Sequence, residues 1–122
     1  GDYARFVLSV MANEGLTSEL AVARLDFADD QRSQVCGFGG LADRECPTGV
    51  GYGLGWLVLR YPDETVLMHA GDDAGEHTLA YFIPEKRRGA VILTNGANGK
   101  ALLGPLARTL GASRALVAFV SR

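Results

Sequence analysis

Hydrophobic and polar positions alternate along the middle of the chain, and this pattern predicts short β-strands. Apolar or aromatic side chains occupy every second position in residues 52–58 and again in residues 77–83. Between them lies a β-branched and apolar run, residues 65–68. Residues 90–93 are apolar without alternation, which is typical of a strand covered on both faces.

Two connections between these runs define how the strands pair. Residues 60–64 and residues 84–89 are rich in turn-forming and charged residues. Both segments are too short for the crossover that parallel strands require. The sequence therefore predicts hairpins and an antiparallel sheet.

Helical periodicity appears before the strands. Asp2 is in position to cap a helix that ends at Gly15, and Thr17 is the expected cap of a second, shorter helix. The first helix has an apolar face made of Tyr3, Phe6, Val7, Val10 and Met11. Because apolar residues at this spacing face a core, we expect this face to be buried.

The same periodicity returns after Asn95. Pro105 predicts a kink in the helix or a start near Gly104. The expected apolar positions of the helix and of the weaker pattern in the tail are Leu102, Leu103, Leu106, Leu110, Leu116, Phe119 and Val120. The order of elements predicts an α+β fold, in which an antiparallel sheet is flanked by N-terminal and C-terminal helices.

Composition limits the function classes. The chain has 122 residues, of which 48% are hydrophobic, so a single domain over residues 1–122 with one modest core is expected. A net charge of -2 gives no general attraction to nucleic acid. No apolar run approaches the roughly 20 residues that span a bilayer. We therefore expect neither a nucleic-acid partner nor a transmembrane segment.

Cys36 and Cys46 are the only cysteines. They lie in the least regular part of the chain, and either a disulfide or two free thiols is compatible with the sequence. Together with His69 and His77 they do not match the paired spacings of structural zinc sites. The glycine clusters lack the endings of phosphate-binding loops, so neither a metal nor a cofactor is expected.

Four sequence blocks carry a family resemblance. In chain order they are Tyr52-Gly53-Leu54-Gly55-Trp56, His69-x-Gly71-x-x-x-Gly75, residues 80–85 (Ala-Tyr-Phe-Ile-Pro-Glu) and residues 91–95 (Val-Ile-Leu-Thr-Asn). In order and spacing they resemble the C-terminal part of the serine β-lactamase-like family, which includes class C β-lactamases, DD-peptidases and related esterases. The resemblance implies the C-terminal half of a β-lactamase/transpeptidase-like fold.

The resemblance also implies site residues. His69, Ala70 and Gly71 fill the positions of a Lys-Thr-Gly or His-x-Gly triplet, in which the first side chain helps to orient the substrate and the general base. The N–H of Asp72 takes the place of an oxyanion-hole donor. Glycine at position 71 is expected because substrate lies against this backbone.

Two of the family's three motifs are absent. No serine is followed three residues later by lysine, and no tyrosine two residues later by asparagine. The chain is therefore expected to be a partial domain, inert alone, whose missing N-terminal portion carries Ser-x-x-Lys. The parent would be a serine acyl-transfer hydrolase, and the family is mostly periplasmic or extracytoplasmic. The alternative is a non-catalytic binding or assembly module that retains the sheet.

Charge near the triplet bears on substrate and partner. Asp72 and Asp73 next to a histidine, where a lysine is common, make the local field unfavourable for an anion, so an ester, a peptide or a cationic amide is expected over a β-lactam. His77 has no motif support and is interpreted as a surface or sheet residue. Without the N-terminal strands, the strand at residues 90–94 would leave an apolar edge open, which predicts self-association.

Overall fold

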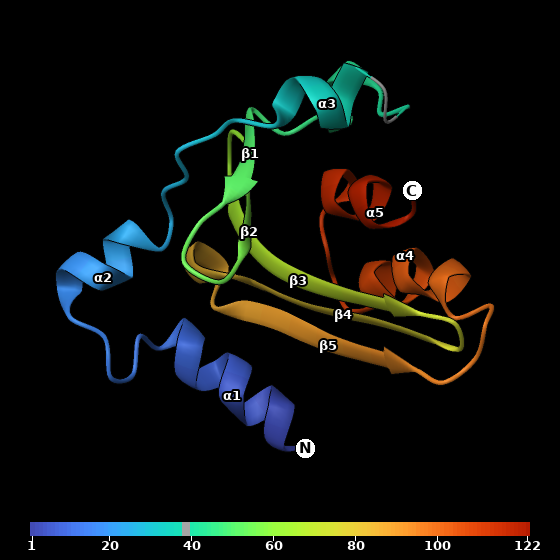
Figure 1. The fold of residues 1–122 in the computed structure, drawn as a ribbon, viewed down its shortest axis with the longest axis horizontal. Helices are drawn as coiled ribbons and strands as arrows, with labels where there is room; N and C mark the ends of the chain where they lie inside the picture. The colour runs from blue at the N-terminus through green and yellow to red at the C-terminus, as the bar shows by residue number, and fades with distance from the viewer. Residues whose placement is uncertain (38–39) are drawn as a thin grey trace.

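A computed structural model describes residues 1–37 and 40–122. It contains an antiparallel sheet with helices on both faces, α4 and α5 on one side and α1 on the other (Figure 1). The α+β class is thus confirmed. The elements are α1 (Asp2–Met11), α2 (Ser18–Ala23), α3 (Arg32–Gly37), η1 (Asp43–Glu45), β1 (Gly49–Tyr52), β2 (Leu57–Arg60), β3 (Thr65–Asp73), β4 (Glu76–Ile83), η2 (Pro84–Lys86), β5 (Arg88–Thr94), α4 (Lys100–Thr109) and α5 (Arg114–Val120).

The five strands form an antiparallel meander in the order β1-β2-β3-β4-β5. Each strand pairs with its neighbours in sequence, as the short connections predict. The pairing of β2 with β3 stops at Leu57 opposite Met68, whereas β3 continues along β4 to Asp73 opposite Glu76. The second half of β3 is therefore paired on one side only.

The two faces of the sheet have separate cores. The core on the face of α4 and α5 consists of Val50, Leu59, Tyr61, Val66, Met68, Leu79, Tyr81, Ile83, Ile92, Leu103, Ala107, Leu116, Val117, Phe119 and Val120. The core on the face of α1 consists of Val7, Trp56, Val58, Leu67, Ala80 and Phe82. Leu67 and Met68 belong to different cores because successive strand residues point to opposite faces.

The prediction of one strand over residues 52–58 is wrong. β1 ends at Tyr52, β2 begins at Leu57, and the residues between them form the turn of a hairpin. Gly55 has a φ of +79°, a conformation that glycine adopts without strain. The alternating pattern continued through a turn, so Tyr52 and Leu54 are exposed rather than buried.

The helix ends differ in part from expectation. Thr17 caps α2, its hydroxyl accepting from the Leu20 N–H, as predicted. Asp2 does not cap α1, because Gly1 occupies the N-cap and Asp2 is the first helical residue. On the predicted apolar face of α1, Val7 is buried, but Tyr3 and Phe6 are largely exposed.

The buried face of α4 also differs from the prediction. Leu103 is buried as expected, whereas the remaining predicted positions, Leu102, Leu106 and Leu110, are exposed. The buried positions beside Leu103 are the small residues Gly104 and Ala107. A Cβ at Gly104 would overlap the Ser121 hydroxyl, so small size permits the close approach of α4 to α5. The helix begins at Lys100 and runs through Pro105.

Three further features complete the fold. Cys36 and Cys46 form a disulfide, so the alternative of two free thiols is wrong.

In β5, Ile92 packs in the core beneath α4 and Val91 packs against the other core, so both faces of this strand have contacts. Within residues 1–37 and 40–122, the structure has no helix long and apolar enough to cross a membrane.

Candidate functional site

The His69-Ala70-Gly71 triplet lies in the half of β3 that has no neighbour on the β2 side. Pairing with β2 ends at Met68, while the triplet continues to pair with β4, with His69 opposite Ala80 and Gly71 opposite Thr78. An open strand edge presents backbone N–H and C=O groups that another extended chain can bind. Residues 69–73 thus form an accessible edge within the sheet.

The direction of the backbone groups on this edge follows from the hairpin that precedes it. The Tyr61 N–H donates to the Glu64 carbonyl at 2.9 Å, so Glu64 directs its backbone groups toward β2. Backbone groups alternate in direction along an antiparallel strand. Ala70 and Asp72 therefore direct their N–H groups away from β4 toward the open edge, whereas Gly71 faces β4.

The His69 side chain lies on the α1 face of the sheet. Its ring meets the edge of Trp56 in a T-shaped arrangement, with 6.5 Å between ring centroids, and the residue is otherwise exposed. Trp56 is itself fixed edge-to-face against Phe82 at 5.0 Å. Offset and edge-to-face aromatic contacts of this kind restrict ring orientation. His69 is thus an accessible imidazole on a rigid support.

The glycine at position 71 has a visible steric reason. A Cβ added to Gly71 would lie 2.6 Å from the Thr78 hydroxyl on the neighbouring strand. Because real Cβ atoms do not approach other atoms this closely, a larger residue would require the Thr78 hydroxyl to move. The constraint seen here is therefore a contact with β4, which acts independently of any substrate.

The carboxylates that follow the triplet point to opposite faces. Asp73 shares the α1 face with His69, and its Oδ1 accepts from the Ala74 N–H at 2.7 Å. Asp72 lies on the α4 and α5 face, because it alternates with Met68 of that core. Of the two predicted acidic neighbours, only Asp73 acts on the same face as His69.

Asp72 is paired with His77, a residue whose role the sequence did not reveal. The two residues face each other across β3 and β4, with 2.5 Å between Asp72 Oδ1 and His77 Nδ1. His77 Nε2 lies 3.1 Å from the Ala97 carbonyl oxygen. The Asp72 carboxylate and the Ala97 carbonyl oxygen both accept a hydrogen bond from His77 only when both nitrogens of the His77 ring carry a proton. The register set by the two-residue turn Ala74-Gly75 is the signal that would have revealed this pair.

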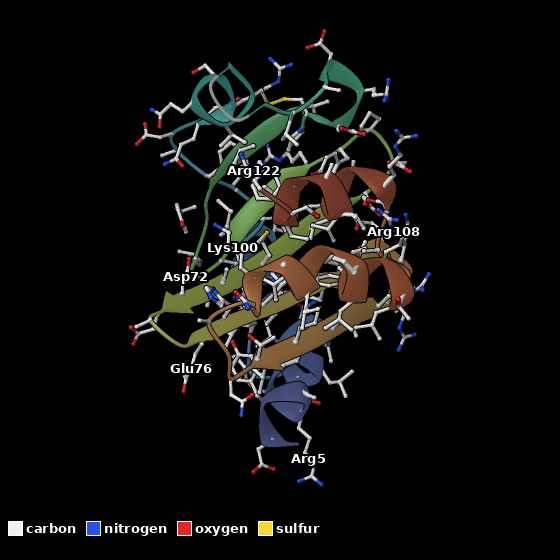
Figure 2. The ribbon with its side chains drawn as sticks, turned by 90° about the vertical axis from the view of Figure 1, so that its right-hand side faces the viewer. Arg5, Asp72, Glu76, Lys100, Arg108 and Arg122 are labelled. Atoms are coloured by element: carbon white, nitrogen blue, oxygen red, sulfur yellow. A yellow bond between two sulfur atoms is a disulfide. The ribbon has the colours of Figure 1, made fainter. Side chains whose placement is uncertain are left out.

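A pocket of 410 Å³ adjoins the Asp72–His77 pair on the α4 and α5 face. Apolar side chains from β3, β4, α4 and α5 line most of it, and Lys100 and Arg122 add positive charge. Figure 2 shows Asp72, Lys100 and Arg122 on the same side of the molecule. Burial lowers the pKa of Arg122.

The described residues include no activated nucleophile. The Ser9 hydroxyl donates to Glu14, and the Ser121 hydroxyl donates to the Val117 carbonyl. In the parts of the chain that the structure describes, no serine is hydrogen-bonded to a lysine or histidine. Within the same parts, no group of three His, Cys, Asp or Glu residues is placed to bind a metal ion. What the arrangement offers is an open edge with outward N–H groups and an adjacent imidazole.

No protein-family model, no curated protein and no solved structure matches this chain.

Proposed function

We propose that this chain is the C-terminal part of a serine acyl-transfer hydrolase and that it contributes the active-site strand. The observation that carries the proposal is the open edge of β3 at residues 69–73, where the Asp72 N–H faces outward. A backbone N–H fixed in this way acts as an oxyanion-hole donor once an acyl group lies along the edge. The motif resemblance independently assigns this role to the same strand.

His69 is the positioning or proton-handling group of this proposal. Its ring is exposed beside the edge and is held against Trp56. An imidazole in this position orients the substrate or exchanges a proton with it. The nucleophile is assigned to a preceding portion of the parent protein, since in the resembling family Ser-x-x-Lys lies N-terminal to this strand.

We assign the substrate to the esters, amides or peptides. A triplet that begins with histidine lacks the fixed positive charge that a lysine would give, and the Asp73 carboxylate is on the same face. A carboxylate-bearing β-lactam is therefore less favourable than an ester, a peptide or a cationic amide. Asp72 contributes less to this preference, because its carboxylate lies on the opposite face against His77.

A binding or assembly module is the second candidate. The β5 strand is an edge of the sheet, and Leu93 on it is 66% exposed. Along α4 and its C-cap, the exposed residues Leu102, Leu106 and Leu110 follow one another at four-residue spacing and form an uncovered stripe. Both features favour association, and we propose that the isolated chain self-associates through them.

Labelling with a fluorescent fluorophosphonate distinguishes the two functions. The isolated chain remains unlabelled in either case, because no serine within the described residues is hydrogen-bonded to a lysine or histidine that could act as its base. The parent protein is labelled at one serine of a Ser-x-x-Lys motif if the hydrolase proposal is correct. A parent that lacks this motif and stays unlabelled would support the assembly module, and labelling of the isolated chain at one defined serine would contradict both.

A further inference from the structure

Arg24 is a buried cation without a counter-charge. It follows α2 directly and is 4% exposed. One guanidinium nitrogen, Nη1, donates to the Val10 carbonyl oxygen at 2.5 Å, while Nε has no hydrogen-bond partner. The ion pairs within residues 1–37 and 40–122 do not include Arg24. The guanidinium also lies over the Phe82 ring, 5.3 Å from its centroid.

Such an arrangement is unfavourable for a structural residue. A charge removed from water without a partner destabilises the folded protein, and buried charges are normally paired. Burial lowers the pKa of Arg24, yet an arginine keeps its proton at neutral pH. The positive charge thus remains in an apolar setting with part of its hydrogen-bonding capacity unused.

A pocket of 220 Å³ adjoins Arg24. It lies between α1, α2 and the turn that connects β1 and β2, and apolar side chains form its walls. A Cβ at Gly53 would lie 2.5 Å from the Arg24 carbonyl oxygen, so the turn packs directly on the end of α2. The lining residues are Val10, Glu14, Leu16, Leu20, Arg24, Leu54 and Trp56.

We propose that this pocket binds a small organic carboxylate with an apolar body, held by Arg24. Guanidinium and carboxylate match in planar geometry, and their charge-assisted hydrogen bonds are stronger than those between neutral groups. Leu16, Leu20 and Leu54 are 39–57% exposed, and they offer apolar surface to the rest of the ligand. Small-molecule sites typically combine apolar walls with one well-placed charge.

Glu14 is the one acidic residue that lines the pocket. It is exposed and accepts a hydrogen bond from the Ser9 hydroxyl at 2.6 Å, so it is oriented by a residue of α1. Its negative charge opposes a carboxylate ligand, and removing that charge is expected to strengthen binding. The site does not include His69, and the inference goes beyond the proposed hydrolase function.

Trp56 makes binding directly measurable because it is the only tryptophan and lines the pocket. The chain is titrated with cyclohexylacetate and, separately, with the neutral isostere cyclohexylacetamide, while tryptophan fluorescence and the indole N–H resonance are followed. The carboxylate is expected to give a saturable response, with affinity about 10-fold or more above that of the amide. Equal responses to the two compounds would overturn the proposal.

Variants test whether Arg24 is the binding group. Arg24→Met is expected to weaken cyclohexylacetate binding about 10-fold or more, and Arg24→Lys several-fold, because lysine lacks the planar fork. Glu14→Gln is expected to strengthen binding about 2- to 5-fold. Val22→Met is the matched control, since Val22 is on α2, the helix that Arg24 follows, is 66% exposed and does not line the pocket.

A second variant keeps the test decisive if Arg24→Met does not fold, as judged by circular dichroism. Leu20→Phe retains the arginine but fills the pocket from a half-exposed helix position. It is expected to reduce carboxylate binding about 10-fold, while Val22→Phe leaves binding unchanged. Undiminished binding in Leu20→Phe would show that the carboxylate binds elsewhere. Weakened binding in Glu14→Gln would show that the anion does not approach this pocket, which also contradicts the proposal.

Discussion

The two faces of the sheet differ in how completely they are covered. Among residues 1–37 and 40–122, the α4 and α5 face has a continuous core of fifteen buried residues, whereas the α1 face has six. The sparsely covered face carries the exposed His69 ring and Arg24, which has no ion-pair partner in the part of the chain that the structure describes, and its helix leaves Tyr3 and Phe6 exposed. The comparison indicates that one face supplies the stability and the other presents the accessible chemistry.

This division has a physical basis in strand alternation. Consecutive residues of β3 contribute to opposite faces, so Met68 stabilises one core while His69 is presented on the other. A strand anchored by a large core can hold an exposed side chain in a fixed position. Functional groups that rest on rigid elements are positioned more accurately than groups on loops.

The largest effect is expected on the free energy of unfolding, from a substitution in the core of the α4 and α5 face. Leu116→Ala, in α5, is expected to lower the free energy of unfolding by about 2–5 kcal/mol, because the residue is completely buried. Val7→Ala, in α1, removes two methyl groups and is expected to lower it by about 1–2 kcal/mol. Urea unfolding of both variants provides the measurement. A larger loss from Val7→Ala would reverse the assignment of stability to the α4 and α5 face.

The disulfide is expected to stabilise the α4 and α5 face, at the edge of its core. Val35 directly precedes Cys36, and Leu41 lies between the two cysteines in sequence. Both pack against the larger core. Reducing the Cys36–Cys46 bond is expected to lower the free energy of unfolding by about 2–3 kcal/mol. Tryptophan emission of the still-folded protein should remain unchanged, because Trp56 belongs to the other core. Chemical denaturation with and without reductant checks both expectations, and an unaltered unfolding midpoint would contradict the first.

Sequence patterns predicted the individual strands and helices better than the contacts between them. The hairpins at residues 60–64 and 84–89, the α+β class and the buried positions of α5 were predicted because alternation and helical spacing depend on local sequence alone. Leu103 was predicted correctly, but the other leucines of the same predicted face are exposed, because the contact of α4 with α5 depends on the small size of Gly104 and not on the leucine spacing. The Asp72–His77 pair and the burial of Arg24 depend on contacts between elements, which a periodicity does not contain.

Association through the uncovered edge should be smaller in effect than loss of core contacts. Leu93→Lys on β5 is expected to weaken self-association of the isolated chain about 10-fold, because a lysine on an edge strand opposes pairing. Val22→Lys, on α2, is the control at an equally exposed position. Light scattering at micromolar concentration measures the effect. A wild-type chain that stays a 13.0 kDa monomer with full β-sheet dichroism would refute the association.

The smallest effect is expected on the free energy of unfolding at acid pH, from the hydrogen bonds that Asp30 accepts beside β1. Asp30 Oδ1 accepts from the N–H groups of Val50 and Arg32, both at 3.0 Å, and these bonds lower the pKa of Asp30 below 3.8. The ionised Asp30 therefore makes its full contribution to the free energy of unfolding above pH 3.8. This contribution is lost as the pH falls through the lowered pKa that Asp30 has in the folded protein. Asp30→Asn should flatten the stability curve in the acid range below pH 3.8, because the amide cannot be titrated there. Identical curves for Asp30→Asn and the wild type would show that these bonds do not matter.

Turnover by the parent protein tests the central claim, that this chain supplies the active-site strand of a serine hydrolase. His69→Ala in the parent is expected to lower the hydrolysis rate of a p-nitrophenyl ester about 10- to 1000-fold, in line with loss of one positioning or proton-handling group. The melting temperature is expected to change little, because His69 is exposed. An unchanged rate accompanied by a large fall in melting temperature would show that His69 is structural and would contradict the account.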